Sequence, residues 1–449
     1  MWIASGLTPE RSFLLLAGVF GVFFCLVTPP HDPADEARHH VRAWLIVEGR
    51  LGVIGTKPGH AASAPRSIVR MHAPGHHYGE EQLRSGHIPA GSRRAPPHQK
   101  SEIDALHDRP LAENDRIEVR YAGAYNPVVY APAVAALWLA RQLDLSAVGG
   151  LLLARVFGLG AWCLGIFAAL RIAPSQRWLL CSVALLPMSV FQAASISADP
   201  FTQVAIFIWF AVLLRGASLP VLLAAALGLG LAKPGYAPLA LASFWLPDEP
   251  ASLGRRSGVA LAALAAAALP TVAWALVVNA AGEPELVPGA DTAGQLKHIL
   301  LHPFAFLALV GRASLALLPS WLEGMVGNLG HLDVEIPGVF TALGLAAVAA
   351  SAGIDRGGLE RGLRLGWLAV SGVCALAILA MAYMGWNPVG APRIQGVQGR
   401  YFLLLLPFAL VALPGLAFVR EDRLRIVIVA ALLAVLAVSG ERMLDRYYA

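Results

Sequence analysis

Long apolar runs dominate the chain, and their spacing predicts its architecture. Stretches such as 12–28, 149–170 and 402–419 carry almost no charge, and a helix of about 20 apolar residues crosses a bilayer core. We therefore predict an all-α polytopic membrane protein with about 11 transmembrane helices, in which residues 1–449 form a single transmembrane domain. The predicted spans are 12–28, 149–170, 178–197, 201–214, two within 219–247, 257–279, 336–353, 365–385, 400–419 and 425–440.

Arginines at the ends of these runs predict the orientation of the spans. Short loops rich in Lys and Arg stay in the cytoplasm, so Arg11, Arg215 and Arg356 indicate inner ends and a cytoplasmic N-terminus. The segments 29–127 and 280–335 are then large extracytoplasmic loops. Two further apolar segments, 128–143 and 296–319, cannot cross the membrane fully, because each extra crossing would put the arginines that follow on the outer side. We therefore predict that both segments lie along the outer membrane surface. The predicted location is the cell inner (plasma) membrane.

Composition indicates the lipid bilayer as the main partner and gives no support for nucleic acid. The chain is 57% hydrophobic and 14% charged, whereas about 25% of the residues in a soluble domain are charged. The net charge of +5 comes mostly from basic residues at the ends of apolar runs, not from a basic stripe interleaved with aromatic residues. The four cysteines lie inside apolar runs, so they predict no disulfide framework or CxxC zinc site. The sequence has no Walker A, GxGxxG, GxSxG or HExxH motif. The oligomeric state is not predicted.

Carboxylates and imidazoles crowd the start of the first outer loop, in the string PHDPADEARHH. If a helix begins at Asp35, then Asp35 and His39 share a face and Glu36 lies beside them. This spacing could hold a divalent metal ion such as Mg, Mn or Zn, or a carboxylate base oriented by a histidine. The alternative is a polar helix start in which Asp35 and Glu36 only satisfy the first turn.

Two charged residues stand close to predicted outer turns. Asp199 lies at the tip of the turn before Pro200, where an Asx-type turn is the alternative explanation. Lys233 is the only charge in the hairpin 219–247, at its predicted outer bend. An ionisable residue near membrane depth indicates function by default, here with an anionic phosphate as partner. The alternative is a lysine that only extends its amine to the membrane surface.

The string QGVQGRYF opens an inward span from the outer side. Glycines allow close approach of a ligand, and Arg400 could bind phosphate through its guanidinium fork, with Gln398 and Tyr401 beside it. An interfacial Arg–Tyr anchor is the alternative. The polar string 327–333 could line the same site. The His-rich segment 55–110 is consistent with a substrate-covering loop, a metal-responsive loop, or an insertion without chemistry.

Taken together, five strings resemble the signatures of a bacterial family of polytopic membrane proteins of unknown function, grouped with the GT-C glycosyltransferases. The strings are Pro33–His39, Leu186–Pro200, Leu231–Tyr236, Gly327–Asp333 and Gln398–Phe402, in order over nearly the whole chain. The resemblance implies a GT-C-like fold and sugar transfer from a polyprenyl-phosphate-linked donor to an extracytoplasmic glycan, lipid or protein acceptor. It implies Asp35 as general base, with Glu36 or His39 as alternate base or metal ligand. It also places Asp199 at the second acidic position and Lys233 and Arg400 at the lipid phosphate.

Two other functions are compatible with the sequence. A glycolipid or polysaccharide transporter or flippase would usually place ionisable residues near the bilayer midplane between inverted repeats, and we find neither feature. A non-catalytic protein of cell-envelope polysaccharide assembly would tolerate the loss of Asp35, Asp199 and Arg400 together.

Overall fold

The computed structural model describes residues 8–71, 109–247, 252–282, 287, 289–354, 358–413 and 421–448. Within these ranges, six helices are long and apolar enough to cross a membrane: α2 (Pro9–Val27), α8 (Ala147–Ile172), α13 (Leu253–Ala281), α15 (Pro303–Val326), α17 (Arg361–Trp386) and α20 (Glu421–Tyr448). Three shorter apolar helices are α11 (Asp199–Leu214), α12 (Leu219–Leu231) and α16 (Gly338–Ser351). The predicted helical membrane architecture is confirmed in that the described chain is mostly helical with little sheet, while the number of about 11 spans stays a prediction.

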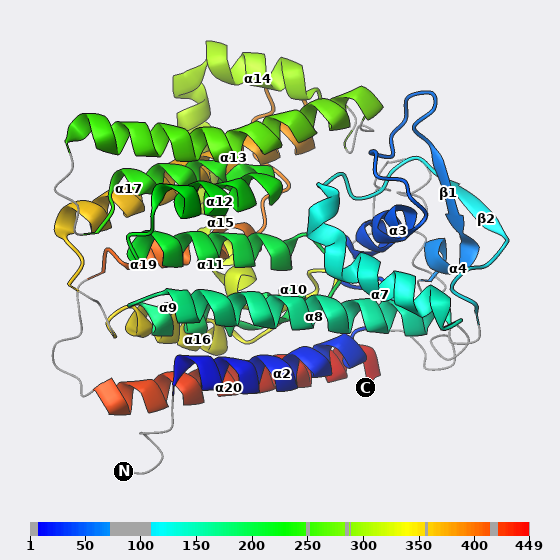
Figure 1. Ribbon diagram of the computed structural model, residues 1–449, viewed down its shortest axis with the longest axis horizontal. Coiled ribbons are helices and arrows are strands. Elements are labelled where there is room, and N and C mark those ends of the chain that lie inside the picture. Colours follow the sequence, from blue (N-terminus) through cyan, green and yellow to red (C-terminus); the bar gives the residue numbers. More distant parts are fainter. Residues whose placement is uncertain are drawn as a thin grey trace.

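One end of the helix bundle carries a small folded cap (Figure 1). The helices α2, α8, α13 and α20 run in roughly the same direction along the bundle, and the cap lies at the end where α2 leads into α3 (Glu36–Val47). The cap also contains α4 (Arg66–Val69) and an antiparallel pair of strands, β1 (Ala62–Pro65) and β2 (Arg116–Val119). The described parts of the predicted first loop, 29–71 and 109–127, therefore contain helices and a strand pair.

The predicted surface helix over 128–143 forms as η1 (Pro127–Tyr130) and α7 (Ala131–Gln142). Helix α7 packs against α8 and α3 and shares with them an apolar core that includes Trp44, Leu137 and Leu151. This core fixes the cap, and with it the start of α3, to the N-terminal end of α8.

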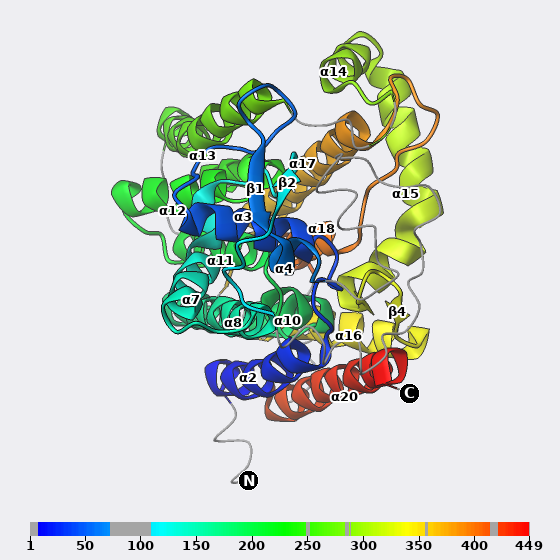
Figure 2. The same ribbon diagram turned by 90° about the vertical axis from the view of Figure 1, so that its right-hand side faces the viewer.

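The prediction of one helix over 296–319 is wrong in its bounds. The helix breaks at His302, before Pro303, into α14 (Thr292–Leu301) and α15, because proline is favoured at the first position of a helix and disfavoured inside one. Helix α15 meets the length and composition of a membrane span, yet Figure 2 shows it running across the direction of α2 and α20. The segment 280–335 is thus mostly helical, and ends in the short strands β3 (Asn328–Leu329) and β4 (Val334–Glu335).

Prolines also divide other predicted spans. The segment 178–197 forms two helices, α9 (Arg177–Ala184) and α10 (Pro187–Ala193), with Pro187 opening the second. The hairpin 219–247 does break at Lys233 as predicted, but its second arm is the 3₁₀ helix η2 (Pro234–Phe244). The segment 400–419 begins as α18 (Arg400–Leu403) and α19 (Leu406–Leu410). The breaks at Lys233 and Arg400 lie close together, because both residues pair with Asp199.

Candidate functional site

Charged residues from four segments meet beneath the cap. Asp35 directly precedes α3, Asp199 begins α11, Lys233 lies at the break between α12 and η2, and Arg400 begins α18. Arg400 is 3.1 Å from Asp35 and 3.8 Å from Asp199, and Lys233 Nζ is 2.6 Å from Asp199 Oδ1. Arg38 pairs with the other oxygen of Asp35. We call these five residues the charged cluster. The structure thus brings together four residues that the sequence singled out separately.

The charged cluster has an excess of positive charge in a sheltered place. Its three cations face two carboxylates, and the side chains of Arg400 and Lys233 are only 3% and 11% exposed. The Nε of Arg400 is buried and has no acceptor among the described residues. Because a buried polar group without a partner is unfavourable, the cluster is suited to receiving an anion.

Asp35 does not act as a helix cap. Its backbone has φ 75°, a left-handed conformation that is uncommon for residues other than glycine, and its side chain makes no capping hydrogen bond. The carboxylate instead contacts Arg38 and Arg400. Burial raises the pKa of Asp35, but the charges of Arg38 and Arg400 outweigh burial and hold that pKa well below its usual range. Asp35 is ionised and, at 32% side-chain exposure, is the most accessible carboxylate of the charged cluster.

Glu36 lies in a different environment from Asp35. Its side chain and that of Arg155 are both 0% exposed and form an ion pair of 2.6 Å. The two Glu36 oxygens also accept the backbone N–H groups of His31 and Ile196, each at 3.1 Å. The contacts with Arg155 and Ile196 tie the first loop to α8 and to the segment before α11, while the contact with His31 lies within the loop. These contacts indicate a structural role for Glu36, and the base role implied by the resemblance stays a prediction.

His39 packs against aromatic residues. Its Nδ1 lies 2.7 Å from the hydroxyl of Tyr130, and its ring stacks on Tyr125 at 5.7 Å between centroids. In the described part of the chain, no three His, Cys, Asp or Glu side chains group as a metal site. Binding of a divalent ion by Asp35 and His39 stays a prediction, with no third ligand of these types there.

Tyrosine rings border the cations. Lys233 Nζ lies 5.4 Å from the ring centre of Tyr125 and 5.6 Å from that of Tyr401, which also faces Arg400 at 5.6 Å. Such contacts stabilise cations where little water reaches them. The Gln398 side chain, which we also expected at the site, has a buried Oε1 that finds no hydrogen-bond partner among the described residues.

Four residues of this region were not singled out from the sequence. Arg38 belongs to the charged cluster and Tyr125 borders it, and Gln192 joins Asp199 to Arg400 when its amide is oriented to satisfy both, at 3.0 and 2.8 Å. Arg155 lies inside the apolar run 149–170. An arginine within a membrane helix is itself a signal of an internal partner, and that signal could have identified Arg155.

The string 327–333 belongs to a second polar contact. Asp333 pairs with Arg446 at 2.9 Å near the end of α20, and the neighbouring Tyr447 donates a hydrogen bond to Asp32. The string thus anchors the last helix near the first loop instead of contributing a described contact to the charged cluster. Most of the His-rich segment, 72–108, lies outside the described residues.

Two buried histidines predict a loss of stability toward low pH. Burial lowers the pKa of His39 and of His40 to about 3, whereas an unfolded histidine titrates near pH 6.5. As the pH falls below about 6.5, the unfolded chain takes up protons before the folded protein does, so the free energy of unfolding decreases. We expect the thermal unfolding midpoint in detergent to fall between about pH 7.5 and about pH 5. A His40→Gln variant should show a shallower fall, and an unchanged slope would contradict this account.

The comparison with protein families covers the whole charged cluster. Residues 18–411 match the family described as "Predicted membrane protein (DUF2142)", a range that includes Asp35 and Arg400 and ends before α20. No curated protein and no solved structure matches the chain. The extent of the family match, together with apolar helices long enough to cross a bilayer, shows that the chain belongs to the DUF2142 family of predicted membrane proteins.

Proposed function

We propose that this protein is a membrane glycosyltransferase of the GT-C type, which moves a sugar from a polyprenyl-phosphate carrier to an extracytoplasmic glycan, lipid or protein acceptor. The observation that carries the proposal is the charged cluster, in which buried cations with spare capacity for an anion lie beside the accessible carboxylate Asp35. A lipid-linked sugar phosphate needs both features. The cations would bind its phosphate, and the carboxylate would accept a proton from the attacking hydroxyl.

The reaction is an inverting transfer. The acceptor oxygen attacks the anomeric carbon of the donor sugar, the bond from that carbon to the phosphate oxygen breaks, and polyprenyl phosphate leaves with the electron pair. Asp35 takes the hydroxyl proton. Arg400 and Lys233 stabilise the negative charge on the departing phosphate, and they act more strongly in their sheltered position than they would in bulk water.

Donor binding also prepares the base. In the unliganded protein, Asp35 is held by Arg38 and Arg400, whose charges lower its pKa and make it a weak proton acceptor. A phosphate that accepts hydrogen bonds from the guanidinium group of Arg400, including its Nε, weakens the ion pair between Arg400 and Asp35. The proton affinity of Asp35 then rises toward the range that suits a general base. This order links base strength to the presence of the donor.

The proposal is tested by a transfer assay on the purified full chain with a panel of polyprenyl-phosphate sugars. We expect transfer from at least one donor, and we expect Arg400→Gln to raise the KM for that donor about 10- to 100-fold, because it removes charged hydrogen bonds to phosphate. Arg141→Gln, at an exposed position on α7, is the matched control and should behave as wild type. Movement of glycolipid across vesicles without transfer from any donor would instead support a transporter.

A further inference from the structure

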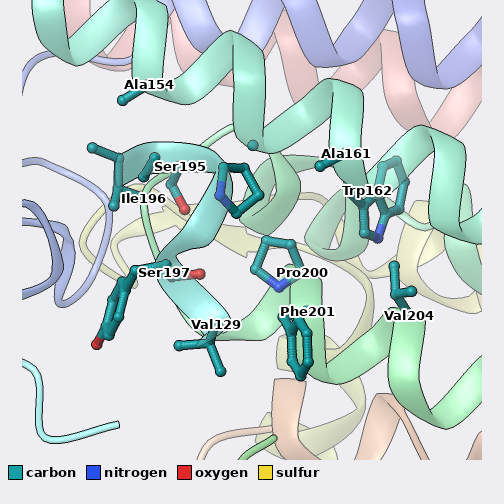
Figure 3. A pocket seen from close by; sticks show the side chains of 14 residues that line it. Val129, Ala154, Ala161, Trp162, Ser195, Ile196, Ser197, Pro200, Phe201 and Val204 are labelled. Carbon is teal, nitrogen blue, oxygen red and sulfur yellow. The ribbon is translucent and has the colours of Figure 1, made fainter. Parts of the chain in front are cut away.

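An apolar groove runs beside the charged cluster (Figure 3). It lies between α8, α11 and the segment around η1, and it holds about 550 Å³ of empty space, part of which is open to the outside. Val129 lines it from η1, Ala161 and Trp162 from α8, and Phe201 and Val204 from α11. Its walls contain no charged side chain. The groove therefore suits an apolar guest.

Two residues that line the groove, Ser197 and Tyr130, make hydrogen bonds to residues in or next to the charged cluster. Ser197 lines the groove and accepts a hydrogen bond from the backbone N–H of Asp199, and Asp199 pairs with Lys233. Tyr130 lines it as well, and its hydroxyl contacts His39. Ser197 in the groove wall thus contacts a residue of the charged cluster, and Tyr130 contacts His39 next to Arg38 in the chain.

The groove follows the direction of the membrane helices. Its lining on α8 extends from Ala154 to Trp162, a distance of roughly 12 Å at the rise of an α-helix. Ala161 in its wall is exposed, so the groove is open along the side of α8. In a membrane that side faces lipid, which gives a long apolar chain an entrance from the bilayer.

We propose that this groove binds the first isoprene units of the donor's polyprenyl chain while the donor phosphate lies at Lys233 and Arg400. The assignment rests on the proposed transferase function. The cations lie inside the bundle, with the Arg400 side chain only 3% exposed. The uncharged groove walls next to this cluster suit a donor that carries its phosphate on one long apolar chain.

Two glycines on α8 provide a matched test. A Cβ added at Gly158, in the groove wall, would meet only the carbonyl of Ala193 at 3.9 Å, so a larger side chain fits without moving the backbone and fills the groove. A Cβ at Gly160 would meet nothing within 4 Å, and this residue is exposed outside the groove. We expect Gly158→Leu to raise the KM for a long-chain donor about tenfold, through lost burial of the chain. Gly160→Leu should leave it unchanged.

Chain length separates a blocked groove from general damage. A donor with the same sugar phosphate on a single isoprene unit should bind wild type more weakly and should be insensitive to Gly158→Leu. An equal effect of Gly158→Leu on both donors, or equal effects of the two variants on the long-chain donor, would overturn the groove assignment. Either result leaves the transferase proposal intact, since transfer is still observed.

A binding measurement tests the groove even if the protein transfers no sugar. Polyprenyl phosphate with a diazirine in its second isoprene unit should crosslink to peptides of α8 or α11 in wild type and Gly160→Leu, and much less in Gly158→Leu. This pattern without any transfer would retain the groove and reject the transferase. Crosslinking elsewhere, or equal competition by a bilayer phospholipid, would overturn the donor chain as the occupant.

Discussion

Replacement of Asp35 by Asn is expected to leave the protein folded and to lower kcat for sugar transfer roughly 10²- to 10⁴-fold, the usual contribution of a general base. Asparagine keeps the shape of the side chain and its contact with Arg400 but cannot take up the acceptor's proton. The KM for the donor should change much less than kcat, because the phosphate is bound by Lys233 and Arg400.

The control for Asp35→Asn is the same replacement at Asp115, a half-exposed carboxylate on the cap that pairs with Arg66. That variant should transfer sugar at the wild-type rate. The measurement is single-turnover transfer with saturating donor, normalised to the folded fraction. A folded Asp35→Asn protein with wild-type kcat would remove Asp35 from the mechanism and leave the charged cluster as a binding site only.

Breaking the buried pair of Glu36 and Arg155 should have the largest effect on stability. Removal of one partner from a fully buried ion pair costs about 3–5 kcal/mol, because the other charge is left without compensation. Arg155 also donates hydrogen bonds to the backbone carbonyls of Cys25, Thr28 and Pro29. We therefore expect Arg155→Met to lower the free energy of unfolding more than Glu36→Gln, and both to reduce the yield of folded protein.

The double variant distinguishes a coupled pair from two independent losses. If Glu36 and Arg155 act as a unit, the combined loss in Glu36→Gln/Arg155→Met is smaller than the sum of the single losses. Denaturant unfolding in detergent gives all four values. Additive losses would contradict the coupling, and a Glu36→Gln protein that is stable but inactive would return Glu36 to the list of candidate bases.

The long spans could be predicted because the length of each apolar run in the sequence sets the approximate length of its helix. The predicted run 257–279 became Leu253–Ala281, and 365–385 became Arg361–Trp386, since a long apolar run without charge has few alternatives to a helix in a bilayer. The predicted bounds are wrong where a proline begins a new helix, as at Pro187 and Pro303. Hydrophobicity alone does not distinguish such a proline from Pro270, which lies inside a continuous helix.

The candidate site could be predicted only residue by residue. Lys233 and Arg400 stood out because each is a charge where the membrane pattern disfavours one. Their shared contact with Asp199 could not be read from the sequence, because it depends on how distant segments pack. The same holds for the difference between Asp35 and Glu36, which are adjacent in the chain. One is accessible and the other is fully enclosed, where it pairs with Arg155, 119 residues away in the chain.

The contact between Tyr447 and Asp32 has a consequence for biosynthesis. These residues are 415 positions apart, and at about 5–20 residues per second the ribosome needs roughly 20–80 s to make the intervening chain. Asp32 lies three positions before Asp35, so the loop that carries the proposed base waits for the last helix before its native packing is complete. In a nascent chain this contact between the first loop and α20 can form only after Tyr447 has been made. Fusion partners placed beyond Tyr448 are expected to slow this final step.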